Sequence, residues 1–434
     1  MKIFITTVAI AIFISASPAC AEETLEWKKC VEEAKAQNPD LVASQEKVNQ
    51  ARANKEITRS VTMPQITGNA ERTTTQSPSG GNTTTSMTSA SSAKRKPATV
   101  YEYDITGEQL LFDGFKTSFN LSSNERSIIA TRYNYDVTSS NVRLRLRTAY
   151  ANLLSSQEYF KVAGEIKGRR KQSLELVRLR YEGGREHRGS LLTSEADLAQ
   201  AIYDVEQARR SIYLSQRQVI KELGQTKYFP FVATGDLDVK ESVREMPDFV
   251  KITETTPFLQ QLVAQKEAAR FGLSAAKAQF FPQIYVSGTL GNTNTSWPAD
   301  KNAWSAGTSF TLPIFDGGNM IANVTKARAV LAQAQADERS GRDSVVVTLS
   351  NTWAVLQDAI DNLAVKKKIL EAARERARIS EAEYAIGLLI YDNWIIIEDN
   401  LVTAKKNFVS AGRDAVIAEA SWIQAKGGTL DYDK

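Results

Sequence analysis

Beyond residue 21 the chain lacks any run of about 18 apolar residues, so it does not encode an ordinary inner-membrane helical protein. It has only two cysteines and one histidine, His187, which is too few for a disulfide framework or a Cys/His metal site. A G-x-S-x-G elbow and a phosphate-binding glycine loop are absent. Two Ser-x-x-Lys pairs, beginning at Ser44 and Ser274, lack the companion motifs of a catalytic set. The sequence predicts no enzyme, no cofactor and no metal site.

Charge is also nearly balanced. The net charge of +4 over 434 residues is a weak excess and predicts no nucleic-acid partner. We interpret the basic run Arg169-Arg170-Lys171 as a solvated helix face, with binding of an acidic partner as the alternative. A second run, Lys94-Arg95-Lys96, either meets anionic lipopolysaccharide or keeps a polar loop in water. His187 is expected to be exposed to solvent.

The N-terminus has the pattern of an export signal. Lys2 precedes an apolar stretch over residues 3–14, and Ala19-Cys20-Ala21 fits an A-x-A cleavage site. We therefore predict a signal peptide over residues 1–21. Cys20 leaves an alternative open, in which it is the lipid-bearing first residue of a lipoprotein. Either reading takes the protein out of the cytoplasm.

The chain is predicted to be an internal tandem duplication. Residues 38–41 match 256–259, and Pro64-Gln65-Ile66 matches Pro282-Gln283-Ile284, both at an offset of 218. Further on the offset is 203, for the following pairs: Phe112-Asp113-Gly114 with Phe315-Asp316-Gly317, Tyr181 with Tyr384, Gly184 with Gly387, and Glu195, Leu198 and Ala201 with Glu398, Leu401 and Ala404. The first copy therefore carries 15 extra residues, in a Thr/Ser/Gly tract over 73–96 that predicts a loop.

Each copy predicts a helix, two strands and two long helices. The first repeat spans 22–223, with strands at about 65–75 and 101–112 and long helices over 115–223. An irregular linker follows at 224–257. The second repeat spans 258–426, with strands at about 284–294 and 304–315 and long helices over 318–426, before a tail at 427–434.

The strand segments alternate polar and apolar residues, and aromatic residues cluster at their ends. This pattern fits tilted membrane strands of about 9–11 residues, and it equally fits a half-buried sheet in a soluble domain. A membrane sheet must close, and the smallest closed barrels have about eight strands. Four strands per chain therefore require several copies to share one barrel, which the long helices would extend as a hollow tube.

The long helical segments contain no proline over 115–181 and 318–384, so each can reach about 100 Å as one rod. Rods of this length need partners along their whole length, as in coiled coils. Each reverses at a glycine-containing tip, Tyr181-Glu182-Gly183-Gly184 in the first copy and Tyr384-Ala385-Ile386-Gly387 in the second.

Taken together, the paired Pro-Gln-Ile, Phe-Asp-Gly and tip motifs resemble the TolC family of outer-membrane channels over nearly the whole mature chain. The resemblance implies a mixed α/β membrane protein, in which a homotrimeric twelve-stranded barrel continues into an α-helical coiled-coil tunnel in the periplasm. It also implies an outer-membrane exit duct for efflux or type I secretion. Its partners would be outer-membrane lipid, a periplasmic adaptor and an inner-membrane pump. The residues leave the cargo open among drugs, metals, siderophores and polypeptides.

The resemblance also suggests site residues around the second tip. The periplasmic aperture would be formed by Asp392, Asn393, Trp394, Ile396, Glu398 and Asp399. The positions of the family's acidic ring hold Asn393 and Ile396 here, so we expect Trp394 and Ile396 to narrow the mouth by bulk. The adaptor would contact Gly184, Gly387, Leu388 and Leu389, although the two leucines equally fit ordinary helix packing.

A soluble periplasmic coiled-coil adaptor or scaffold is the main alternative function. It would account for the signal peptide and the helices. It would not account for duplicated strand pairs that are flanked by aromatic residues and inserted between helices.

Overall fold

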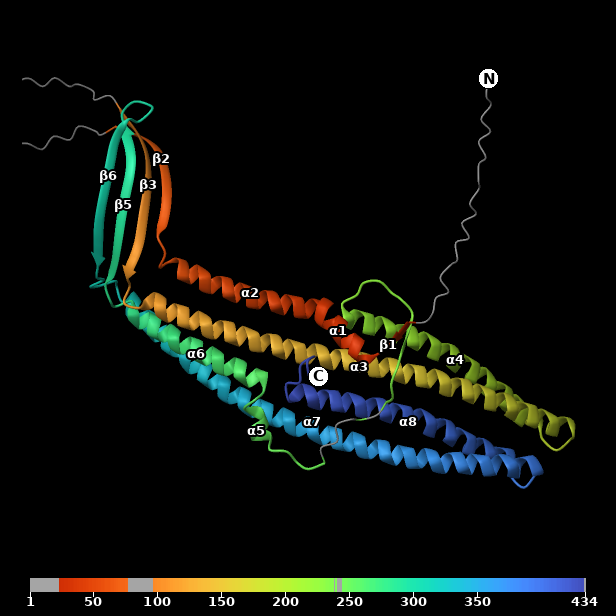
Figure 1. Cartoon of the computed structure of the whole chain (residues 1–434). Coiled ribbons are helices and arrows are strands. Elements are labelled where there is room, and N and C mark those ends of the chain that lie inside the picture. The colour runs from red at the N-terminus through yellow and green to blue at the C-terminus, as the bar shows by residue number, and fades with distance from the viewer. Residues whose placement is uncertain (1–22, 77–96, 238, 240–243, 433–434) are drawn as a thin grey trace, which may run out of the picture.

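The computed structural model describes residues 23–76, 97–237, 239 and 244–432 (Figure 1). The predicted signal peptide, Cys20 and the basic run 94–96 lie outside the described residues. The elements are β1 (Glu23–Leu25), α1 (Trp27–Gln37), α2 (Pro39–Ser60), β2 (Gln65–Thr75), β3 (Ala98–Phe112), α3 (Lys116–Glu182), α4 (Arg188–Leu223), β4 (Phe231–Ala233), α5 (Phe249–Thr253), α6 (Pro257–Ala278), β5 (Gln283–Asn294), β6 (Lys301–Thr311), α7 (Asn319–Ile386) and α8 (Tyr391–Ala425).

Three predictions about the elements were wrong. The fourth strand ends at Thr311 rather than 315. The first helix of the chain is two helices, because Asn38 adopts an extended backbone and its side chain accepts hydrogen bonds from the backbone N–H groups of Asp40 and Leu41 at the start of α2. The linker over 224–257 is not irregular throughout, since it contains β4 and α5.

The Phe-Asp-Gly segments begin the two long helices. The Asp113 carboxylate accepts a hydrogen bond from the backbone N–H of Thr117 at 2.8 Å, and the Asp316 carboxylate accepts one from that of Met320 at 2.8 Å. Each aspartate thus satisfies a donor that the helix itself leaves without a partner. Gly114, at φ +69°, faces Phe281 so closely that a Cβ atom would collide with that side chain. The duplicated motif is therefore a helix start that also turns the chain out of the sheet.

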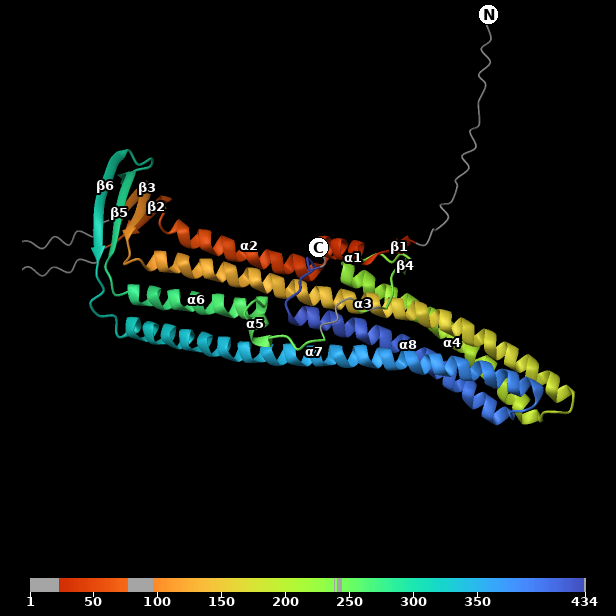
Figure 2. The ribbon, with the colours of Figure 1, turned by 60° about the horizontal axis from the view of Figure 1, so that its bottom comes forward.

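The strands of the sheet and the helices next to the sheet follow one another side by side in the same order. The sheet runs β2-β3-β5-β6, and all three pairs are antiparallel. Helix α2 leads into β2, β3 leads into α3, α6 leads into β5, and β6 leads into α7. The helices nearest the sheet accordingly pack in the order α2-α3-α6-α7 (Figure 1). Farther from the sheet, α4 takes the place of α2 and α8 that of α6 (Figure 2).

The sheet has one apolar and one polar face. The register places Ile105 beside Leu290 and Leu290 beside Trp304, so these side chains lie on the same face. On the opposite face Asn69 donates to Asp104 at 3.1 Å, and the hydroxyls of Thr106 and Thr289 are 2.9 Å apart. Every residue of β2 and β6 is exposed in the single chain. The chain therefore covers neither face of its outer strands.

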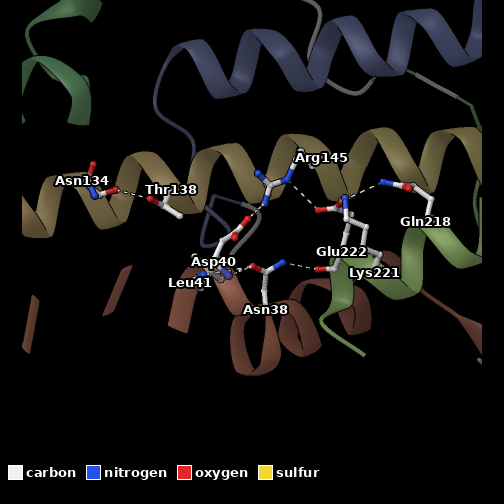
Figure 3. A network of polar contacts seen from close by, with 9 residues as sticks. All are labelled: Asn38, Asp40, Leu41, Asn134, Thr138, Arg145, Gln218, Lys221 and Glu222. Atoms are coloured by element: carbon white, nitrogen blue, oxygen red, sulfur yellow. Dashed lines mark hydrogen bonds and ion pairs between the residues drawn. The ribbon is translucent and has the colours of Figure 1, made fainter. Parts of the chain in front are cut away.

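Beside the long helix α3, two pairs of shorter helices lie end to end, and we call each pair a column. The first column consists of α2 and α4, and the second of α6 and α8. The Asn38 amide donates to the carbonyl oxygen of Glu222 at 2.8 Å, which connects the start of α2 to the end of α4 (Figure 3). Arg145 of α3 pairs with both Asp40 and the buried Glu222 across this junction (Figure 3). Gly224, at φ +81°, ends α4 so close to Gln37 that a Cβ atom would collide with its carbonyl oxygen.

The matching junction lies between α8 and α6. Gly427, at φ +84°, follows the end of α8 and contacts Pro257 at the start of α6, where a Cβ atom would again collide. A glycine after one helix and a proline at the start of the next thus make each pair of short helices one column.

A belt of short elements covers one side of α3. We use the term belt for α1, β1, β4 and the tail residues 427–432. Leu25, Phe231 and Leu430 from these elements pack in one buried cluster with Tyr150 of α3. The Tyr150 hydroxyl lies 2.6 Å from the carbonyl oxygen of Thr234 and 2.9 Å from that of Leu25. The belt gives the helical layer a covered and an uncovered face.

Among the described residues, no helix combines the length and the apolar character that crossing a bilayer requires.

Candidate functional site

The end of the molecule farthest from the sheet consists of two hairpin tips (Figure 1). In the first, α3 turns into α4 through residues 183–187, with Gly184 at φ +69°. In the second, α7 turns into α8 through residues 387–390, with Gly387 at φ +84°. A side chain rarely adopts such a φ, so both turns depend on glycine.

Aromatic residues fill the space between the two tips. Tyr384 of α7 and Trp394 of α8 stack with ring centroids 4.2 Å apart and planes 11° apart. Tyr391 meets both rings edge-on, and Val177 of α3 completes the cluster. Tyr384 and Trp394 are 0% and 1% exposed. This cluster fixes the second hairpin internally and joins it to the first.

Arg180 of the first hairpin binds the same tyrosine in two ways. Its guanidinium lies 4.5 Å from the centre of the Tyr384 ring, and its Nη1 donates to the Tyr384 carbonyl oxygen at 2.6 Å. The Tyr384 hydroxyl donates to Glu186 at 3.0 Å. Burial, and then the hydrogen bond to Glu186, raise the pKa of Tyr384 above its ordinary value. The hydroxyl therefore stays protonated and donates throughout the physiological pH range.

Ion pairs connect the hairpins about three helical turns above the tips. Arg169 of α3 donates to both oxygens of Glu398 of α8, at 2.7 and 3.1 Å, and lies 3.4 Å from Glu381 of α7. Arg170 pairs with Asp399 of α8 and lies 3.7 Å from Asp197 of α4. The Glu398 side chain is only 4% exposed, so its charge depends on Arg169. Two adjacent arginines thus hold all four helices together.

The interpretation of run 169–171 as a solvated face was therefore wrong for two of its three residues. The side chain of Arg170 is 9% exposed, and that of Arg169 is 33% exposed. Lys171 alone is exposed. A run of like charges does not reveal partners that lie about 230 positions farther along the chain.

Comparison with known proteins identifies the family. The family model for outer membrane efflux proteins matches residues 30–225 and 250–428. The chain belongs to the outer membrane efflux protein family. Members of this family are outer-membrane channels, and the chain is accordingly an outer-membrane protein with a large portion in the periplasm.

Individual relatives are distant. The chain is 22% identical to the outer membrane efflux protein BepC of Brucella suis over 64% of this chain and 62% of BepC. The match therefore spans less than two thirds of BepC. It is also 22% identical to Nodulation protein T of Rhizobium leguminosarum bv. trifolii, over 82% of this chain and 76% of that protein.

Solved channels share the fold of this family member. OprN, an outer-membrane channel, superposes with a TM-score of 0.80 at 19% identity, covering 93% of this chain and 90% of OprN. The MtrE outer-membrane channel of Neisseria gonorrhoeae gives 0.78 at 20% identity, covering 93% and 89%. At such low identity these comparisons establish the arrangement of helices and strands. They do not establish the role of any residue.

The residues predicted for the aperture separate into two groups. Asp392, Asn393 and Ile396 are exposed on the first turns of α8. Trp394 is buried against Tyr384, so in the single chain its bulk fills the hairpin, whereas the sequence suggested that it narrows the aperture. Glu398 and Asp399 are held by Arg169 and Arg170, as described above.

The predicted adaptor-contact residues also differ in exposure. Leu388 is 77% exposed, whereas Leu389 packs against the aromatic cluster. Ordinary helix packing, the alternative reading of both leucines, thus applies to Leu389 alone. Gly184 has open space around the position of a Cβ atom. His187 is exposed as predicted, and it also starts α4, because its Nδ1 accepts from the backbone N–H of Ser190 at 3.2 Å.

Arg169, Arg170, Arg180 and Glu186 were not singled out for this site from the sequence. Tyr384 was noted only as a repeated motif residue. Its counterpart Tyr181 is 38% exposed, so the same motif position is surface in one copy and core in the other. Arg180 lies one turn before Gly184 and Glu186 lies two residues after it, and this charged pair around the first tip could have suggested the polar contacts.

Proposed function

We propose that three copies of this chain form the outer-membrane exit duct of a tripartite efflux or type I secretion system. The observation that carries the proposal is the four-stranded sheet. It has an apolar and a polar face, and in the part of the chain that the structure describes its outer strands β2 and β6 have no partner on their free edges. Free edges in lipid leave backbone groups unpaired, so neighbouring copies must supply the missing strands.

Three chains would supply twelve strands, above the roughly eight of the smallest membrane barrels. The apolar face with Ile105, Leu290 and Trp304 would meet lipid. The polar face with Asn69 and Asp104 would meet water inside the barrel. The barrel would close by pairing β6 of one copy with β2 of the next.

The helical layer supports the same closure. Its edges are α2 and α4 on one side and α7 on the other. Of these helices, α2 leads into β2 and α7 follows β6. Along α7, Val347, Val355 and Val365 are more than half exposed in the single chain, with exposed fractions of 60%, 56% and 52%. A neighbouring copy would place its α2 and α4 against α7. A tandem duplication accounts for the repeated element order of each chain.

We further propose that the uncovered face of the helices is the inner wall of this tube. The belt adds a second layer on the other face, where it would surround the tunnel without blocking it. Cargo would pass without a catalytic step, since the duct itself transfers no energy. The inner-membrane pump and the periplasmic adaptor would act at the tips, where Leu388, Gly184 and Gly387 are accessible.

The aperture would lie between the second hairpins of the three copies. Asp392, Asn393 and Ile396 are exposed on the first turns of α8 and would face the passage or a neighbouring copy. Any movement of α7 and α8 away from α3 and α4 would have to break the Arg169–Glu398 and Arg170–Asp399 pairs.

The native mass of protein extracted from outer membranes in mild detergent tests the proposal, with the detergent contribution subtracted. A stable trimer supports the shared barrel. A monomer that is released without detergent would contradict it and favour the soluble coiled-coil adaptor.

A further inference from the structure

Two neighbouring grooves lie along the upper half of the helical layer. The first, of about 640 Å³, lies between α3, α6 and α7, and the second, of about 390 Å³, lies between α2, α3 and α6. Both are lined by Ser127, Thr131 and Gln265, so they are parts of one surface. We call this surface the upper wall. Its other polar lining residues include the amides Asn54, Asn120, Asn134 and Gln261.

All charges on the upper wall are positive. Lys116 and Lys326 line the first groove and Lys47 lines the second, whereas no aspartate or glutamate lines either one. Within the described residues, no ion pair is formed by any of these three lysines. Elsewhere on the same helices charges alternate in sign and pair, as Lys55 does with Glu125 at 2.8 Å and Lys266 with Glu338 at 2.6 Å. The one-signed charge is therefore confined to the grooves.

Helical phase places the upper wall on the uncovered face. Tyr150 marks the side of α3 that the belt covers. Ser123, which lines the first groove, precedes Tyr150 by 27 residues, or about seven and a half helical turns, and so lies on the opposite side. Tyr159, nine residues or about two and a half helical turns after Tyr150, lines a further groove on that same opposite face.

From this placement we propose that the upper wall is an anion-binding zone inside the tunnel, which takes cargo carrying carboxylate, phosphate or sulfonate groups. The inference rests on the proposed function, in which the uncovered face is the inner wall. Three lysines per chain would then surround the passage at successive levels, and rings of lysine are a means by which pores select anions. Walls of low dielectric concentrate the field of such charges, and the amide groups supply hydrogen-bond donors.

The zone ends at the sheet. The polar face of the barrel carries Glu71 on β2 and Glu102, Asp104 and Glu108 on β3, which share that face by register. The duct would thus have an acidic section beside a basic one. The ion selectivity of the whole channel would reflect both the acidic and the basic section. Block by a multivalent anion that binds in the basic section is therefore a more specific probe than ion selectivity.

Block of single-channel current by citrate, a multivalent carboxylate, tests the proposal. Trimers are reconstituted in planar bilayers, and citrate is added to each side in turn. In the Lys47→Gln/Lys116→Gln/Lys326→Gln variant we expect half-block to need at least about tenfold more citrate than in the wild type, because the field that concentrates the anion is lost. A matched control, Lys55→Gln/Lys266→Gln/Lys277→Gln, removes the same charge from α2 and α6 outside the grooves and should behave as the wild type.

Three results would overturn the anion-binding zone while leaving the channel intact: current without citrate block, equal block in wild type and groove variant, or a loss of block in the control as large as in the groove variant. Native mass verifies that each variant still forms trimers. A wild-type protein that forms trimers in detergent but conducts no current would instead overturn the proposed function, and the inference with it.

Discussion

At the sheet end, every residue of β2 and β6 is exposed in the single chain, whereas at the tip end Tyr384 and Trp394 are almost completely buried. The tips are stabilised by contacts within the chain, namely a stacked aromatic pair and arginines that form ion pairs between the two hairpins. The sheet leaves an apolar face and two edges without cover. One end of the molecule is therefore completed by its own residues, and under the proposed function the other would be completed by lipid and further copies.

The largest expected effect comes from a charge on the apolar face of the sheet. Leu290→Arg places a cation between Ile105 and Trp304, where the bilayer would impose about 2–4 kcal/mol per chain. We expect the yield of detergent-stable trimers in outer membranes to collapse. Ser287→Arg is the matched control on the polar face of the same strand, and it should assemble normally. Equal behaviour of the two variants would show that neither face meets lipid.

The second largest effect is a difference in local stability between alanine variants of the two duplicated tyrosines at the tips. Tyr384→Ala removes a buried ring that stacks on Trp394, at an expected cost of about 3–5 kcal/mol in local stability. Tyr181→Ala, at the matching and exposed position, should cost less than about 0.5 kcal/mol. Hydrogen exchange of amides in residues 380–398 of the assembled protein measures both. If the two variants exchange alike, the second tip is not held by its aromatic cluster.

A smaller effect is expected from the ion pair beside this cluster. Arg169→Met leaves the buried carboxylate of Glu398 without its partner, which we expect to cost about 1–3 kcal/mol after allowing for the one-third exposure of Arg169. Lys171→Met, two positions away and exposed, should cost close to nothing. Protection of the α8 amides from exchange reports the difference.

The double variant Arg169→Met/Glu398→Met sharpens this prediction. Replacing both charges with apolar groups should recover most of the lost protection, because no buried charge remains. Failure to recover would mean that Arg169 stabilises the tips through contacts other than this pair.

The smallest expected effect depends on pH. Because the pKa of Tyr384 is raised in the folded protein, the protonated hydroxyl contributes its full stability below about pH 10, and this contribution is lost as the pH rises beyond that value. Tyr384→Phe removes the hydrogen bond to Glu186, at a cost of about 1 kcal/mol, and with it this part of the alkaline loss. Exchange protection of wild type and variant should therefore converge above pH 10. A constant gap between them would contradict the assignment.

The comparison also shows which features could be predicted from sequence. Alternation of polar and apolar residues placed strands where β2, β3, β5 and β6 lie, although the last was set a few residues too late. Glycine spacing placed the turns at Gly184 and Gly387. These features arise from neighbouring residues, so local patterns are sufficient to find them.

The contacts that define the candidate site could not be predicted in this way. Arg169 and Glu398 are brought together only by the packing of α3 against α8, and the run 169–171 is locally indistinguishable from a solvated basic face. Likewise the tip motif is the same in both copies, but only Tyr384 is enclosed, because Arg180 and Trp394 pack on it. Which copy of a duplicated residue becomes core depends on its tertiary partners.

The central claim, that β6 of one copy pairs with β2 of the next, can be tested by disulfide cross-linking. Cysteine replaces Thr67 on β2 together with Ser305, Gly307 or Ser309 on β6, one pair at a time, all on the polar face. Paired strands lie about 4.8 Å apart, within the Cα separation that a disulfide permits. Cys30 does not interfere, because it is buried and burial raises its pKa to about 12. The account predicts that one of these pairs gives a ladder of monomer, dimer and trimer with nothing larger. Ladders that extend beyond three chains, or no intermolecular link from any pair, would contradict it.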